Sequence, residues 1–191
     1  NITIKLLIIT VVAGALLGVV YSITKEPIAK QLEKAATEAR IAAFPEAAGF
    51  KDSKAAIPED YSIIKNAFYA LDKDGNVVGA TMGITTKGYG SGLNMTVGIG
   101  ADGKIKGVII GDNTETPGLG KLAAEPKFLG QYAGKPYDSP LKAVKSPSGD
   151  YEIEAISGAT VTSRAVTNAV NTAAEFYKQL GGAKCLLWRH R

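Results

Sequence analysis

The sequence predicts an α+β protein in which a single N-terminal transmembrane helix and a helical stalk precede a domain with a largely antiparallel sheet packed by helices. Three observations support this fold class. An uncharged apolar run lies near the N-terminus, a strand–turn–strand pattern occurs twice in the middle of the chain, and a small-residue turn precedes a helical pattern near the C-terminus. We expect the membrane anchor at residues 1–25, the stalk at 26–45, the domain at 46–182 and a tail of uncertain origin at 183–191.

The apolar run extends from Leu6 to Thr24 and contains no charged residue. At 1.5 Å per residue it spans about 28 Å as a helix, close to the hydrocarbon thickness of a bilayer, about 30 Å. Lys5 and Lys25 flank the run and can extend toward the two membrane interfaces. A cleavable signal peptide is the alternative, but the length of the run and the lack of an A-x-A site after it favour a retained span.

A second helical pattern follows from Pro27 to Ala43 and is predicted to end before Pro45. Proline suits the first position of a helix, so Pro27 is expected to start this stalk. Within the apolar run, Gly14 and Gly18 form a GxxxG pair, which favours contact with another membrane helix.

The rare residues limit the chemistry that the body of the chain can perform. The only Cys, Trp and His are Cys185, Trp188 and His190. Catalysis by Cys–His or Ser–His–Asp groups, thiolate zinc sites and iron–sulfur ligation are therefore excluded before residue 185. Redox chemistry in this chain would need an organic cofactor. The net charge of +4 arises from scattered Lys and Arg residues and aromatics make up only 7% of the chain, so a nucleic-acid partner is not expected.

Two hairpins are predicted, at residues 67–85 and 95–112. Each contains an Asp-Gly pair between two apolar runs, Asp74-Gly75 in the first and Asp102-Gly103 in the second. The alternation within these runs suggests a sheet with one face covered by helices. A further strand is expected at residues 151–156, and a helix after it whose apolar positions repeat every three or four residues until Gly181.

Two glycine-rich connections lie between these elements, at residues 87–92 and 113–128. The second contains Thr116-Pro117-Gly118-Leu119-Gly120 directly before a short helical stretch. Glycine at such places allows close approach of the backbone or a positive φ. The plain alternative is an ordinary loop, in which Glu115 is a solvated surface acid.

The segment from Ser157 to Ser163 reads "SGATVTS" and joins the last predicted strand to the last helix. Free N–H groups and the positive end of a helix dipole gather at such a junction and favour an anion such as phosphate. The segment has no Walker lysine and no G-x-G-x-x-G pattern, so neither nucleotide loop is expected. From spacing alone, side-chain capping of the helix by Ser157, Thr160, Thr162 or Ser163 is the simpler interpretation.

The same segment resembles the flavinylation motif S/T-G-A-T-x-T of the FMN-binding domain family. The single span, the "GYG" stretch, "VIIGDNTETPGLG", "EPKFLGQY" and the helix after the motif resemble the G subunits of Rnf ion-translocating electron-transport complexes. The resemblance covers residues 3–180, and the tail matches no pattern of that family. The related C subunits of sodium-pumping NADH:quinone reductases share the motif but usually carry a longer soluble domain.

The resemblance implies an electron-relay subunit of a ferredoxin:NAD⁺ oxidoreductase, with FMN joined to Thr162 by a phosphoester and no independent catalysis. A separate flavin transferase would attach FMN from FAD, and the partners would be the other membrane subunits and membrane lipid. The soluble domain would lie on the outer side of the inner membrane. A non-redox binding or scaffold module is the alternative from another functional class. Besides Thr162, the implied cofactor-binding residues are Ser157, Gly158, Ala159, Thr160, Glu115, Thr116, Gly118, Leu119, Gly120 and Tyr89.

Overall fold

A computed structural model describes residues 1–90 and 92–181 of the chain. The predicted tail, with Cys185, therefore lies outside the described residues, as does Ser91. The chain divides into two compact units, residues 1–38 and 39–191, which are described separately below.

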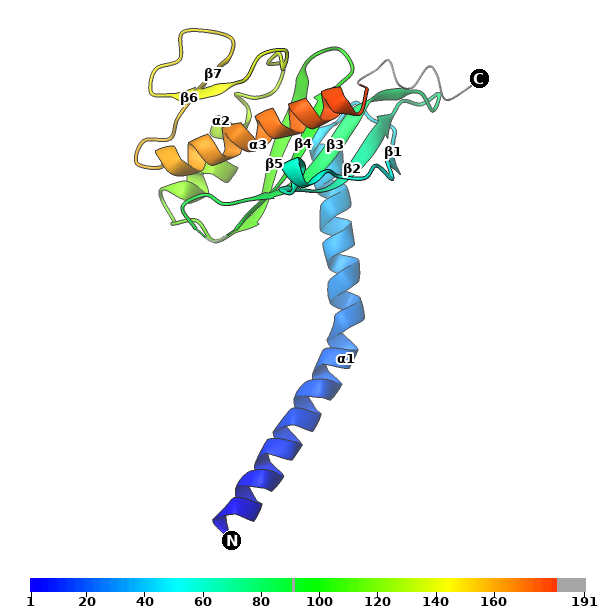
Figure 1. The fold of residues 1–191 in the computed structure, drawn as a ribbon, viewed down its shortest axis with the longest axis vertical. Helices are drawn as coiled ribbons and strands as arrows, with labels where there is room; N and C mark the ends of the chain where they lie inside the picture. The colour runs from blue at the N-terminus through cyan, green and yellow to red at the C-terminus, as the bar shows by residue number, and fades with distance from the viewer. Residues whose placement is uncertain (91, 182–191) are drawn as a thin grey trace. The chain divides into compact units, whose positions relative to one another are not determined.

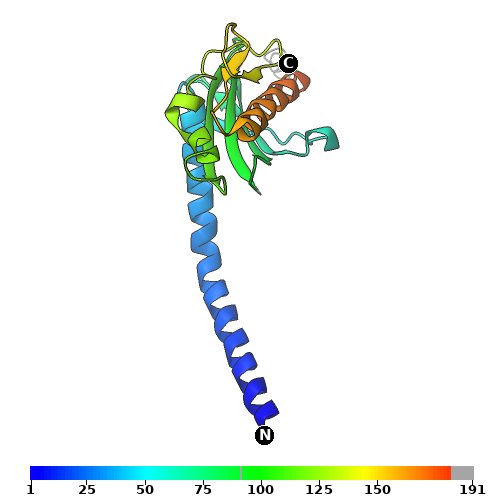
Figure 2. The same cartoon turned by 90° about the vertical axis from the view of Figure 1, so that its left-hand side faces the viewer.

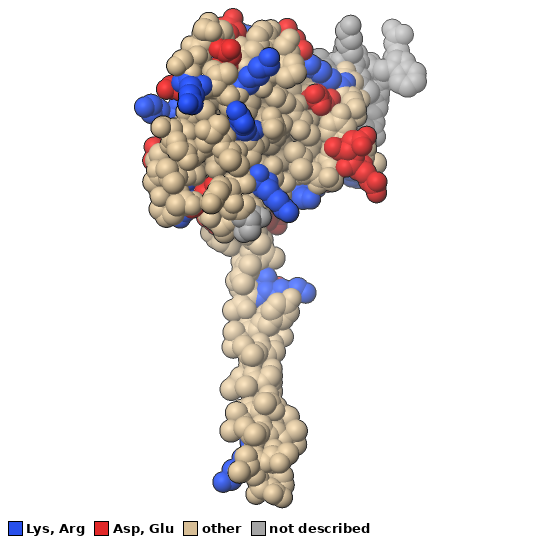
Figure 3. All heavy atoms as spheres, turned by 60° about the vertical axis from the view of Figure 1, so that its left-hand side comes forward, with Lys and Arg blue, Asp and Glu red and all other residues tan. Residues whose placement is uncertain are grey.

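The first unit consists of the greater part of α1 (Ile2–Ala43), a single helix that includes both the predicted anchor and the predicted stalk. Among the described residues, α1 is the one helix long and apolar enough to cross a membrane. Figure 3 shows a nearly uncharged surface along its first half. Pro27 lies inside α1 and does not start a helix, so that prediction was wrong. A proline inside a helix removes one backbone hydrogen bond, but here the helical patterns on both sides continue through it.

The second unit contains an antiparallel sheet with the strand order β1-β2-β3-β4-β5 (Figure 1). The strands are β1 (Gly49–Asp52), β2 (Ile64–Leu71), β3 (Val77–Thr86), β4 (Leu93–Gly100) and β5 (Ile105–Asn113). Both predicted hairpins are confirmed, as β2–β3 and β4–β5, with Gly75 and Gly103 at φ 83° in their turns. β1 was not predicted; it pairs with β2 through Gly49 and Leu71.

The last helix, α3 (Thr160–Gln179), lies along one face of the sheet (Figures 1 and 2). Its predicted apolar positions are buried against core residues of β3 and β4 such as Met82 and Val97. The helix ends just before Gly181, which has φ 91°. The buried positions of α3 that were predicted from periodicity are Val166, Ala169, Val170, Ala173, Ala174 and Tyr177.

Short elements complete the second unit. They are the 3₁₀ turns η1 (Glu59–Tyr61) and η2 (Gly120–Ala124), the helix α2 (Pro126–Leu129), and the strands β6 (Lys142–Val144) and β7 (Glu152–Glu154). β6 and β7 pair in parallel as a separate two-stranded sheet. The strand predicted at residues 151–156 is present as β7 but is shorter than expected. β6 was not predicted, because the prolines in the surrounding segment are typical of a loop.

The last turn of α1 belongs to the second unit and packs on the glycine-rich side of the sheet. Ala43 and Phe44 are both fully buried. A Cβ on Gly79 would meet the Phe44 ring at 2.5 Å, and a Cβ on Gly107 would meet the Ala43 carbonyl oxygen at 3.0 Å. A side chain on Gly98 would overlap that same carbonyl. Glycines on three neighbouring strands thus provide the room in which the helix end sits.

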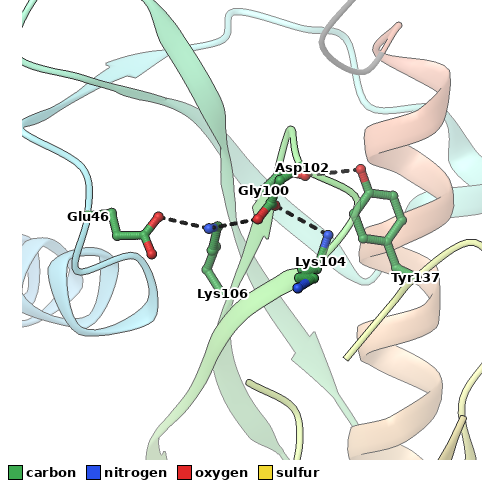
Figure 4. A network of polar contacts seen from close by, with 6 residues as sticks. All are labelled: Glu46, Gly100, Asp102, Lys104, Lys106 and Tyr137. Atoms are coloured by element: carbon green, nitrogen blue, oxygen red, sulfur yellow. Dashed lines mark hydrogen bonds and ion pairs between the residues drawn. The ribbon is translucent and has the colours of Figure 1, made fainter. Parts of the chain in front are cut away.

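Polar contacts join this helix end to the β4–β5 hairpin (Figure 4). The Lys106 ammonium lies 2.8 Å from a Glu46 carboxylate oxygen and 3.0 Å from one of Asp102. The hydrogen bond to Glu46 is the main cause of a raised pKa at Lys106, and the Asp102 carboxylate adds to it. The Tyr137 hydroxyl donates a hydrogen bond to the Gly100 carbonyl oxygen at 3.1 Å, which connects the hairpin to the loop before β6.

Candidate functional site

The segment Ser157–Ser163 forms a tight turn between β7 and α3. Gly158 has φ 77°, a conformation that side-chain-bearing residues rarely adopt. The α3 helix begins at Thr160, and the N-cap residue Ala159 makes no side-chain capping hydrogen bond. Ser163 instead closes the turn from inside: its hydroxyl accepts the Ile156 N–H at 3.0 Å and donates to the Ala159 carbonyl at 3.0 Å. Side-chain capping of the helix end, the simpler interpretation from spacing, was therefore wrong.

Thr162, two residues into α3, points into the protein. Its side chain is buried, with 1% of the residue's surface exposed, and its hydroxyl donates a hydrogen bond to a Glu115 carboxylate oxygen at 2.7 Å. Glu115 follows β5 and is itself only 2% exposed. The alternative that Glu115 is a solvated surface acid was therefore wrong. A buried carboxylate needs hydrogen-bond donors, and Thr162 is one of them.

Three glycines surround the Glu115 carboxylate. The Gly90 N–H donates a hydrogen bond to its second oxygen at 2.9 Å. A side chain on either Gly88 or Gly120 would overlap the carboxylate, on Oε1 and Oε2 respectively. Gly90 is also confined, because a Cβ there would lie 2.8 Å from the Thr114 carbonyl oxygen. We call Gly88, Gly90 and Gly120 the glycine cradle; the absence of side chains there gives the carboxylate the space in which it bonds to both Gly90 and Thr162.

Apolar side chains are exposed beside this buried pair. Leu119 is 43% exposed and Val161 55% exposed. Leu119 lies against the turn, since a Cβ on Gly158 would be 2.9 Å from its Cδ2. Tyr89, between two glycines of the cradle, is 80% exposed. Outside α1, these three are the exposed large hydrophobic residues of the described chain, and a planar apolar ligand could cover them.

The first turn of α3 also presents backbone donors. In the part of the chain that the structure describes, the N–H groups of Thr160, Val161 and Thr162 have no hydrogen-bond acceptor. Val161 and Arg164 line an open cavity of about 400 Å³ together with Lys87. Free N–H groups, a helix dipole and two cationic side chains make this end of α3 favourable for an anion.

The structure brings most of the predicted site residues to one place. Glu115, Leu119, Gly120, Gly158 and Thr162 are linked by the contacts described above. The remaining predicted residues flank them. Ala159 is buried at the N-cap of α3, Thr160 and Ser157 are exposed on the turn, the Thr116 carbonyl accepts the N–H groups of Leu119 and Lys121, Gly118 turns the loop at φ 75°, and Tyr89 stands on the neighbouring connection.

Sequence reasoning missed Val161, Gly88 and Gly90. Val161 carries a usable signal, because an apolar residue in the first turn of a helix, between two threonines, lies off the buried stripe of Val166, Ala169 and Ala173. The two glycines carry no such signal, since their role depends on a carboxylate 25 residues away from Gly90 in sequence.

The residues of this site lie in a segment that matches a known protein family. Residues 88–175 match the model of the FMN-binding domain family, a segment that includes the cradle, Glu115 and Thr162. The G subunit of the Na⁺-translocating ferredoxin:NAD⁺ oxidoreductase complex of Acetobacterium woodii is 34% identical over 190 residues, which cover 92% of this chain and 89% of that protein. The proton-translocating counterpart from Clostridium ljungdahlii is 37% identical over 120 residues, 63% of this chain and 64% of the relative, slightly less than two thirds of its length.

Among solved structures, NqrC of Shewanella oneidensis aligns with a TM-score of 0.55 and 26% identity, covering 69% of each chain. Its similarity confirms an antiparallel sheet packed by helices as the fold. The match to the Acetobacterium protein has a higher identity than the match to NqrC and covers more of this chain. Residues 88–175 match the FMN-binding domain family, and the chain belongs to the family of G subunits of ion-translocating oxidoreductase complexes.

Proposed function

We propose that this protein is the membrane-anchored electron-relay subunit of an ion-translocating ferredoxin:NAD⁺ oxidoreductase complex, and that it carries FMN bound covalently through a phosphoester to Thr162. One observation carries the proposal most directly. The Thr162 hydroxyl, which the flavinylation motif identifies as the attachment point, donates a hydrogen bond to Glu115. It lies at the N-terminal end of α3, where backbone N–H groups are free, and the exposed side chains of Leu119 and Val161 lie beside it.

The residues at the end of α3 fit a phosphoester. The free N–H groups of the first turn and the helix dipole would stabilise its negative charge. The exposed hydroxyls of Ser157 and Thr160 are placed on the same turn and can donate further hydrogen bonds. Gly158 and Ala159 keep the turn small, and only glycine suits the positive φ at 158.

The exposed apolar residues fit a planar ring system. Leu119, Val161 and Tyr89 offer apolar contact while leaving the ring accessible from solvent. Bound FMN would supply the ability to accept and donate electrons singly, which no side chain of residues 1–184 provides. A covalent link keeps such a group in place where an open site would allow it to dissociate.

The membrane part of the proposal rests on α1 and on the relatives. α1 has the length and composition of a span, and its Gly14–Gly18 pair is suited to packing against a helix of another subunit. We propose residues 1–25 as the anchor, 26–45 as the stalk, 46–182 as the FMN-binding domain and an outer position for that domain. The relatives named as subunits of multi-protein complexes support partners among other membrane subunits.

The C subunit of a sodium-pumping NADH:quinone reductase is the nearest alternative. The structural similarity to NqrC supports it, but at 26% identity over 69% of the chain this match is weaker than the 34% identity with the Acetobacterium relative. Identification of the subunits that purify with the full chain decides between the two complexes.

A non-redox membrane-anchored scaffold is the alternative from another class. The full-length protein, co-expressed with a flavin transferase and extracted from membranes, separates it from the flavoprotein. We expect a band with flavin fluorescence on a denaturing gel, because a phosphoester survives denaturation. A non-fluorescent band would contradict the proposed function.

A further inference from the structure

We infer that Glu115 is a catalytic residue of the protein's own flavinylation: it aligns the Thr162 hydroxyl and accepts its proton when the oxygen attacks the flavin donor. The inference rests on the proposed function and adds to it a role for a buried carboxylate that binding of a flavin ring does not require. In this role the protein would contribute a reacting group to its maturation and would not be a passive substrate of the transferase.

The geometry of the pair supports proton transfer. The Thr162 hydroxyl donates to Glu115 Oε2 at 2.7 Å, so the hydrogen already points at the carboxylate. A threonine hydroxyl is a weak nucleophile until a neighbouring base removes its proton. A general base must lie within hydrogen-bond reach of the proton it takes, and this carboxylate does.

The surroundings of Glu115 hold the carboxylate in that position. Its other oxygen accepts the Gly90 N–H at 2.9 Å, and the backbones of Gly88 and Gly120 lie so close to the carboxylate that a Cβ on either would overlap it. At 2% exposure the carboxylate is shielded from water, which would otherwise compete for the hydroxyl. A purely structural acid at this depth would be expected to pair with a cation. Among the described residues, Glu115 forms no ion pair with a lysine or arginine.

The covalent step balances with FAD as the donor. Thr162 Oγ1 forms a bond to the phosphorus on the riboflavin side of the pyrophosphate, and the bond from that phosphorus to the bridging oxygen breaks. AMP leaves with the bridging oxygen, and the proton passes from Thr162 Oγ1 to Glu115 Oε2 and then to solvent. No electron transfer or further reactant is needed. Because Thr162 is almost fully buried, the donor reaches its hydroxyl only after the groups that cover Thr162 move.

The test measures the rate of FMN incorporation into the purified full-length protein with the transferase and FAD, read by in-gel flavin fluorescence and intact mass. Glu115→Gln keeps the size of the side chain but cannot take the proton, so we expect loading to slow about 10²-fold or more. The residual rate should rise with pH as hydroxide replaces the missing base. Glu115→Asp should load at an intermediate rate. Asp112→Asn, the same change at an exposed position three residues earlier, should load like the wild type.

The outcomes separate the inference from the proposed function. If the wild type loads and Glu115→Gln loads at the same rate, the inference is wrong and the proposed function stands. If the wild type does not load at all, both are wrong. Should Glu115→Gln fail to fold, as judged by its thermal unfolding, Glu115→Asp takes its place, because it keeps the charge and withdraws the carboxylate from Thr162. Wild-type loading by that variant would equally overturn the role of Glu115.

Discussion

The hydroxyl of Thr162 and the carboxylate of Glu115 form a buried hydrogen bond of 2.7 Å between residues 47 positions apart in the chain. The bond joins the loop after β5 to the first turn of α3, the two segments that carry most of the predicted cofactor-binding residues. Its integrity depends on the glycine cradle, which excludes side chains from the space that the carboxylate occupies.

The cradle can be tested by adding a single methyl group. In Gly120→Ala the new Cβ would overlap Glu115 Oε2 and displace the carboxylate from Thr162. We expect FMN loading to fall at least 10-fold, with a loss of stability of about 1–3 kcal/mol from overpacking. Gly92→Ala is the matched control, because a Cβ there meets no atom within 4 Å. Equal loading rates of the two variants would show that the cradle does not position Glu115.

Tyr177 and Tyr132 form a second matched pair. Both are buried in the core, but the Tyr177 hydroxyl has no hydrogen-bond partner among residues 1–90 and 92–181, whereas the Tyr132 hydroxyl is 2.8 Å from Thr167 Oγ1. Because an unpaired buried hydroxyl costs free energy, Tyr177→Phe should raise the free energy of unfolding by up to about 1 kcal/mol, and Tyr132→Phe should lower it by about 1 kcal/mol. Urea unfolding at pH 7 measures both. A Tyr177→Phe variant less stable than Tyr132→Phe would contradict the assignment.

The burial of Tyr177 also leads us to expect a loss of folding stability at alkaline pH. Burial is the main cause that raises the pKa of Tyr177 to about 12, above its ordinary value near 10. The unfolded chain therefore loses this proton first, so the stability from Tyr177 is complete below pH 10 and declines as the pH rises toward 12. The decline should approach about 1.4 kcal/mol per pH unit, and Tyr177→Phe should reduce the slope. An unchanged slope in the variant, measured by urea unfolding between pH 9 and about 11.5, would refute this origin.

The packing of the C-terminal end of α1 against the sheet leads to a prediction about folding stability alone. A side chain on Gly98 would overlap the Ala43 carbonyl, a backbone group that cannot move without shifting the end of α1. Gly98→Ala should therefore destabilise the domain by about 1–3 kcal/mol. Gly111→Ala in the neighbouring strand is the control, because the nearest atom to its new Cβ is 3.8 Å away. Thermal unfolding of both variants in detergent is the measurement, and equal midpoints would contradict the close packing.

The elements predicted from sequence were those with a local cause. The two hairpins follow from Asp-Gly turns between alternating strands, and α3 from a repeat of apolar residues at helical spacing. β1 and β6 were not predicted, since they have four and three residues and gain their stability from pairing with other segments. Pro27 was assigned to a helix start because proline favours the first position of a helix. In the structure the helical segments on both sides of Pro27 form one continuous helix, α1.

The candidate site was predictable in its membership and not in its arrangement. The motif and the loop 115–120 were identified from residue types, but nothing local indicates that Glu115 is buried against Thr162. That contact depends on the packing of α3 against η2 and β5 against η2. Gly88 and Gly90 could be recognised as part of the site only after the position of the carboxylate was known.

Covalent attachment of FMN at Thr162 is the central claim, and the intact mass of the membrane-extracted protein after co-expression with the transferase tests it most directly. The wild type should gain the mass of one FMN less one water, with the modified peptide fragmenting at Thr162. Thr160→Val should retain the addition and Thr162→Val should lose it. An unmodified wild-type mass, or an addition that survives in Thr162→Val, would contradict the claim.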